Sequence, residues 1–123
     1  YFIYLDRNTE LARKNVLNPA ALDIIIHQRA TFRQAFTLPF DCTGYTVVAQ
    51  VWSDKRRSLL FEFTVEWIDQ AAGSFYLVAD FEDTTNMKKN GIWDLMVIQP
   101  NNERYYWLEG IAVLDPGVTD PDA

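Results

Sequence analysis

The stretch from Cys42 to Trp67 constrains the fold most, because its side chains alternate with a period of two. In its second half one side is apolar and the other is mostly polar: Leu59, Phe61, Phe63, Val65 and Trp67 oppose Leu60, Glu62, Thr64 and Glu66. Such alternation is typical of a strand with one buried face. Residues 45–52 are rich in β-branched and aromatic side chains, which suit strands. Because the cations at 55–57 cannot be buried together, the stretch predicts a hairpin with a solvated tip.

Further short segments of the same character are separated by turn residues: 22–27, 31–38, 74–81, 92–99 and 104–114. Helical pieces are expected only within 8–17 and 83–90, the second ending at Gly91. Neither is long enough to connect parallel strands. The sequence therefore predicts an all-β fold, an antiparallel β-sandwich of about seven to eight strands, immunoglobulin-like or jelly-roll-like. Cys42 is the single cysteine, so the immunoglobulin pair of cysteines is missing and only the architecture is similar.

The domain organisation follows from length and composition. A chain of 123 residues is long enough for one domain with its own core. We expect an N-terminal extension over 1–21, a β-sandwich domain over 22–115 and a mobile acidic tail over 116–123. The net charge of −6 argues against a nucleic-acid groove or an anionic membrane surface as the main partner. No apolar run approaches the roughly 20 residues of a membrane helix, and the opening residues lack the basic flank of a signal peptide.

The N-terminal extension differs from the rest of the chain. It begins with an apolar segment, Tyr1 to Leu5, and continues with a helix-like segment that Asn8 or Thr9 would cap and that would end near Leu17. Two interpretations are open: the extension folds back onto its own domain, or it is an arm that docks on a neighbouring subunit. Exposed apolar residues at a terminus would be unfavourable in an isolated monomer.

Residues that usually carry chemistry are sparse or scattered. His27 and Cys42 are each single in the sequence, so neither a nucleophile with its base nor a zinc site is indicated, and Cys42 is expected to pack as a small hydrophobe. Glu62 and Glu66 would lie about 13 Å apart along one strand, beyond the separation used in glycoside hydrolysis. The acidic cluster at 80–83 is either a solvated loop, which is favoured, or a weak calcium site. We expect no catalytic residue, metal or cofactor.

Aromatic residues, 15% of the chain, are more informative. The alternation predicts several of them as core: Phe61, Phe63, Trp67, Phe75 and Phe81. It does not assign the faces of Trp52, Tyr76, Tyr106 and Trp107. If these were exposed together, they would form either a subunit interface or a platform for sugar rings, and the interface is favoured.

The order and spacing of a series of segments between residues 22 and 119 carry a family resemblance. The segments are DIIIHQRATFRQAFTL, CTGYTVVAQVW, AAGSFYLVADF, NGIWDLMV, WLEGIAVL and GVT. Together they resemble a family of small bacteriophage virion proteins that includes the N-terminal domain of phage upper baseplate proteins. Two positions depart from that pattern: Gln28-Arg29-Ala30 stands where the family often has a Gly-Asp turn, and Cys42 where it often has Leu.

The resemblance implies a non-enzymatic structural protein of the virion, placed in the tail, the baseplate or the periphery of the head. We expect an adaptor or fibre anchor that assembles with other phage virion proteins in the host cytoplasm, as a homo-oligomer or in multiple copies, without nucleic acid or membrane. The alternatives are a carbohydrate-binding module for host recognition and a head decoration protein. The expected assembly interface combines the extension with two of the unassigned aromatic residues: Tyr1, Phe2, Ile3, Tyr4, Leu5, Leu11, Val16, Leu17, Trp52 and Tyr106.

Overall fold

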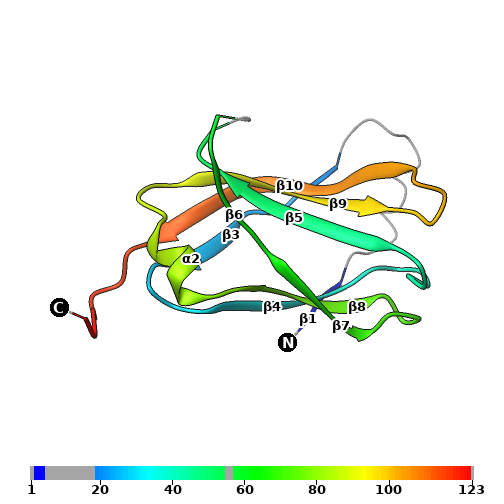
Figure 1. Ribbon diagram of the computed structural model, residues 1–123, viewed down its shortest axis with the longest axis horizontal. Coiled ribbons are helices and arrows are strands. Elements are labelled where there is room, and N and C mark those ends of the chain that lie inside the picture. Colours follow the sequence, from blue (N-terminus) through cyan, green and yellow to red (C-terminus); the bar gives the residue numbers. More distant parts are fainter. Residues whose placement is uncertain (1, 5–18, 55–56, 123) are drawn as a thin grey trace.

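The fold is a sandwich of two β-sheets, which Figure 1 shows one above the other. The structure, a computed structural model, describes residues 2–4, 19–54 and 57–122. These residues form ten strands and one short helix, so the prediction of an all-β sandwich is confirmed. There are more strands than expected, because one predicted strand is divided and two very short strands, β1 and β2, are added.

The four-stranded sheet has the order β1-β4-β8-β7. Its strands are β1 (Phe2–Tyr4), β4 (Phe32–Thr37), β8 (Ser74–Ala79) and β7 (Thr64–Asp69). β4, β8 and β7 pair antiparallel, whereas β1 lies parallel to β4, with Ile3 opposite Phe36.

The six-stranded sheet has β6, β5, β9 and β10 as antiparallel neighbours, with β2 and β3 both on the far side of β10. Its strands are β2 (Ala20–Ala21), β3 (Ile24–His27), β5 (Thr46–Trp52), β6 (Leu59–Glu62), β9 (Gly91–Ile98) and β10 (Arg104–Asp115). β2 and β3 pair parallel with β10. The expectation of purely antiparallel pairing is therefore wrong at two edges. The chain passes from β3 directly to β4 in the other sheet, so β3 forms no hairpin and pairs with a strand distant in sequence.

The predicted hairpin over residues 42–67 is only half formed. β5 and β6 pair antiparallel, with Val51 opposite Phe61. At Phe63, whose backbone N–H donates to the Ala49 carbonyl at 2.9 Å, the chain leaves this sheet and continues as β7 in the other. The alternation still predicts the inward side chains correctly, since Phe61 and Phe63 are buried; Leu59, at the strand start, is 47% exposed.

The short helix α2 (Phe81–Thr85) begins earlier than predicted. Asp80 caps it by accepting a hydrogen bond from the Asp83 backbone N–H at 2.9 Å. Phe81, predicted as a core strand residue, is therefore in the helix and is 51% exposed. Gly91 does not end a helix but opens β9, where a Cβ would lie 2.7 Å from the Trp52 carbonyl oxygen. Close approach of β5 is the reason for glycine at this position.

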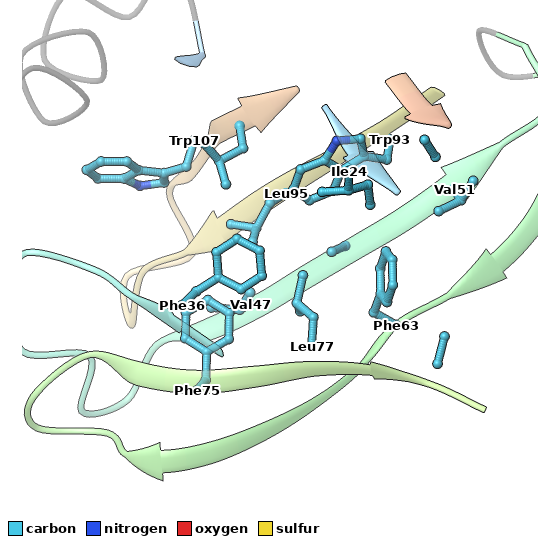
Figure 2. Close-up of a cluster of buried hydrophobic side chains, with 14 of the residues drawn as sticks. Ile24, Phe36, Val47, Val51, Phe63, Phe75, Leu77, Trp93, Leu95 and Trp107 are labelled. Atoms are coloured by element: carbon cyan, nitrogen blue, oxygen red, sulfur yellow. The ribbon is translucent and has the colours of Figure 1, made fainter. Parts of the chain in front are cut away.

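The core fills the space between the two sheets (Figure 2). Aromatic rings connect the layers: Phe36 of β4 lies tilted against Trp93 of β9 with centroids 6.4 Å apart, and Phe63 meets the same Trp93 edge-on at 6.4 Å. Because the inward positions of both sheets are occupied by this cluster, the sheets offer function only their outer faces, their edges and the loops.

The C-terminal residues 116–122 lie against the turn between β3 and β4. Arg29 donates hydrogen bonds to the carbonyl oxygens of Pro116, at 2.7 Å, and Thr119, at 3.3 Å. Arg29 itself has a φ of +66°, a left-handed conformation that favours glycine. The mobility expected of the tail stays a prediction.

Candidate binding surface on the six-stranded sheet

The outer face of the six-stranded sheet carries side chains in three parallel rows, which we call the grid. The register of β5, β9 and β10 defines the rows as Trp52–Ile92–Ile111, Gln50–Asp94–Glu109 and Val48–Met96–Tyr106. A polar row thus lies between two apolar rows. The three strands are neighbours in the upper sheet of Figure 1.

A groove of about 370 Å³ lies over this grid. Its lining includes residues of all three rows: Val48, Gln50, Trp52, Ile92, Asp94, Met96, Tyr106 and Glu109. This volume is within the range of small-molecule sites, which are mostly apolar with a few convergent polar groups. The grid has that composition, so the groove is the best candidate for a ligand site in the described part of the chain.

A chain of hydrogen bonds holds part of the groove in place. The Trp52 indole N–H donates to Gln50 Oε1 at 2.9 Å, and Gln50 Nε2 donates to Glu62 Oε1 at 2.7 Å. These contacts fix the orientation of the Trp52 ring and of the Gln50 amide. Less side-chain entropy is then lost when a ligand binds to either residue.

A β-bulge decides which aromatic residue of β10 faces the groove. The register with β9 shifts between Tyr106 and Leu108, so that Trp107 and Leu108 are both buried. Tyr106 is 49% exposed on the outer face, whereas Trp107 is 1% exposed and contacts the Phe40 ring at 5.5 Å. Trp107 therefore does not belong to an exposed aromatic platform, because the bulge interrupts the alternation of side chains at this point.

Tyr76 does not belong to this surface either. It lies in β8 of the opposite sheet, where the Arg33 guanidinium is 4.1 Å from its ring centroid. Arg33 also forms an ion pair with Glu66 at 3.0 Å. Of the four unassigned aromatic residues, the structure thus brings only Trp52 and Tyr106 to one face. Glu62 and Glu66, expected on one strand, lie in different sheets.

The polar row was not recognised as a site from the sequence. Gln50, Asp94 and Glu109 come from three strands, and only the register shows that they are neighbours. One signal was available: Asp94 is the single charged residue in the otherwise apolar segment 92–98. A charge inside such a strand indicates a functional or paired position, because burial of a charge without a partner is costly.

The N-terminal residues of the predicted interface are described only in part. Phe2–Tyr4 form β1 on β4 of the same chain, in line with an extension that folds back. Tyr1, Leu5, Leu11, Val16 and Leu17 lie outside the described residues. A contact of the extension with a neighbouring subunit stays a prediction.

The remaining candidates do not form a site. His27 Nδ1 lies 3.4 Å from Asp115 Oδ2 in an exposed pair. Asp80 caps α2. The pKa of Asp83 is raised above its ordinary value, mainly by burial and secondly by the negative charge of the nearby Asp80 carboxylate. Within residues 2–4, 19–54 and 57–122, no group of three His, Cys, Asp or Glu could hold a metal ion. Nor does this part of the chain contain a helix that could cross a membrane.

Cys42 is fully buried, with its Sγ 3.6 Å from the Phe40 carbonyl oxygen. Burial, assisted by the charge of Asp41, raises the pKa of the thiol to about 11. Since the thiolate is the reactive form, we expect native protein at pH 8 to react with Ellman's reagent at least a hundredfold more slowly than protein unfolded in guanidinium. The absorbance of the released chromophore measures both rates. Equal rates would show that Cys42 is accessible and ionised.

Comparison with known proteins assigns no family to this architecture. No family model matches the chain, and no curated protein matches it. The function must therefore be argued from the surfaces described above together with the resemblance in the sequence.

Proposed function

We propose that this protein is a non-enzymatic structural component of a bacteriophage virion, an adaptor in the tail or baseplate or an anchor for a fibre. The resemblance over residues 22–119 supports a place in the virion. The surface of the fold supports a role in assembly. It assembles through an exposed apolar part of its six-stranded sheet and through its N-terminal segment, with other virion proteins or further copies of itself.

One observation carries the assembly role: an apolar corner at the β3 edge of the six-stranded sheet, made of Ile25, Ile111 and Val113. β3 and β10 pair in parallel, with Ile25 opposite Val113, and all three side chains point away from the core. Ile25 is 55% exposed and Ile111 is 48% exposed. Contiguous apolar side chains on an outer face mark interaction sites, because their burial against a partner is favourable.

The edge of the four-stranded sheet supports the same role. Among the described residues β1 is the last strand of that sheet, so its outer edge presents backbone donors and acceptors. Such an edge can pair with a strand of another chain. Strand addition at β1 and burial of the apolar corner would give two separate contacts, one on each sheet.

The test is incorporation of the double variant Ile25→Asp/Ile111→Asp into particles. Two charges on the apolar corner should oppose burial against a partner while leaving the core intact, since both side chains face outward. We expect at least a tenfold drop in the amount of protein per purified virion, measured by quantitative mass spectrometry after complementation of a deletion phage.

The matched control is Ile68→Asp, because Ile68 is 45% exposed but lies in β7 of the other sheet. This variant should be incorporated normally. Thermal melts of all variants establish that they fold. Wild-type incorporation of a folded double variant would contradict the proposal.

A further inference from the structure

The two aromatic residues of the groove stand at opposite corners of the grid. Trp52 is at the β5 end of one apolar row, Tyr106 is at the β10 end of the other, and Asp94 is at the centre. The corners are separated by two strand spacings and by four residues along a strand, which gives about 16 Å between them. The groove is therefore a diagonal with an aromatic ring at each end and a carboxylate in the middle.

Along this diagonal the chemistry alternates in a way that suits sugar rings. A pyranose ring has apolar C–H faces and hydroxyl groups at its rim. Aromatic rings such as Trp52 and Tyr106 bury the apolar faces. Carboxylates such as Asp94 and Glu109 can accept hydrogen bonds from hydroxyl groups. The span of the diagonal matches a chain of about three linked rings better than a single sugar.

The side chains of the groove are held in place before a ligand binds, and this supports the same class of ligand. The Trp52 ring edge is engaged by Gln50, which is in turn held by Glu62. The indole N–H group is therefore already engaged by Gln50, and the ring is what Trp52 offers to a ligand. A fixed ring face favours stacking, the contact that sugar rings make.

Charge narrows the ligand class. The groove-lining residues in the described part of the chain include two carboxylates, Asp94 and Glu109, and no Lys or Arg. Glu62 extends the same row on β6, opposite Gln50. An anionic sugar would be repelled by this row, whereas an uncharged sugar would be accepted.

We propose that this groove binds an uncharged oligosaccharide, with sugar rings stacked on Trp52 and Tyr106 and hydroxyl groups hydrogen-bonded to Asp94 and Glu109. The site goes beyond the assembly role and does not depend on it, since the apolar corner shares only Ile111 with the grid and Ile111 does not line the groove. Binding is measured with the isolated protein and incorporation with particles, so the failure of one is distinguishable from the failure of the other.

The experiment is titration calorimetry of the full chain with defined tetrasaccharides. The uncharged probes are cellotetraose, maltotetraose, chitotetraose and lacto-N-neotetraose, and the anionic probe is tetragalacturonate. We expect at least one uncharged probe to bind at millimolar concentration or below, and tetragalacturonate to bind at least tenfold more weakly.

Variants place the ligand in the groove. Trp52→Ala and Tyr106→Ala should each weaken binding at least tenfold; Tyr106 is half exposed, so its removal leaves the core intact. Asp94→Asn keeps the shape of the side chain but removes the central charge. The affinity of the anionic probe should therefore come closer to that of the uncharged probes. The matched control is Tyr76→Ala, which removes an aromatic side chain from the opposite sheet and should leave binding unchanged.

Several outcomes would overturn the proposal. One is that no uncharged probe binds at millimolar concentration, and another is that tetragalacturonate binds best. A third is that binding persists in folded Trp52→Ala and Tyr106→Ala variants. Binding of tetralysine instead of any saccharide would assign the groove to a basic peptide and would equally exclude a sugar site.

Discussion

Replacement of Gly110 by alanine is expected to cost about 3 kcal/mol or more of folding free energy, a large part of the roughly 5–15 kcal/mol of a typical domain. A Cβ at this position would lie 2.1 Å from the Leu22 carbonyl oxygen and 2.6 Å from its carbon. The obstacle is backbone and cannot rotate away. Leu22 is held on both sides, because its N–H donates to Glu109 O at 2.9 Å and its carbonyl accepts from Trp93 Nε1 at 2.7 Å.

The measurement is urea denaturation of Gly110→Ala beside Gly117→Ala. Gly117 has a φ of +63°, so alanine there is also strained, by about 1–2 kcal/mol. Its Cβ, however, would meet nothing closer than Arg29 Nη2 at 3.8 Å. The control thus separates backbone strain from steric exclusion. If Gly110→Ala cost no more than Gly117→Ala, the crossing of the β2–β3 connection over β10 would not be as tight as described.

Side-chain direction along a strand is local, and for that reason much of the core could be predicted from the sequence. Phe61, Phe63 and Phe75 face the interior as the alternation indicates. The partner of a strand is not local. Residues 59–67 alternate without interruption, yet the segment is shared between two sheets, and nothing in its pattern marks Phe63 as the crossing point.

The candidate site depends even more on what alternation cannot show. The sequence predicts Trp52 and Tyr106 individually as interface residues, but that they share one groove follows only from the register of β5, β9 and β10. The bulge at Trp107 leaves Tyr106 on the outer face and Trp107 in the core, two positions that the alternation did not assign. A single extra residue in a strand changes no composition and leaves no clear trace in a single sequence. The pairing of β1 with β4 could not be predicted from the sequence either, because only three residues take part.

Trp93 is the residue whose truncation should have the other large effect. Its side chain is 1% exposed and lies between the sheets, near Phe36 and Phe63 (Figure 2). Trp93→Ala would leave a cavity, at a cost of about 3–5 kcal/mol. It would also leave the Leu22 carbonyl without its indole donor, which adds roughly 1–3 kcal/mol for a buried acceptor. We therefore expect a variant that is largely unfolded at moderate temperature, as measured by circular dichroism and urea titration.

Two milder variants make the interpretation specific. Trp93→Phe keeps most of the ring but loses the indole N–H, so it should cost only about 1–3 kcal/mol. Trp52→Ala removes an indole from the outer face and should cost less than about 1.5 kcal/mol, which also keeps it usable in the binding experiment. A cost of Trp93→Ala close to that of Trp52→Ala would contradict the position assigned to Trp93.

Gly110 and Trp93 both contact one atom, the Leu22 carbonyl oxygen, so the stability costs of replacing them should not be additive. Gly110→Ala displaces this carbonyl, and Trp93→Phe removes the donor that holds it. Once the carbonyl has moved, the hydrogen bond from Trp93 is already lost, so its removal costs little more. The double variant should therefore be more stable than the sum of the single costs predicts, by about 0.5–3 kcal/mol in a double-mutant cycle. Strict additivity would mean that the connection between β2 and β3 is held at another point, and that Gly110 and Trp93 act on separate parts of the sheet.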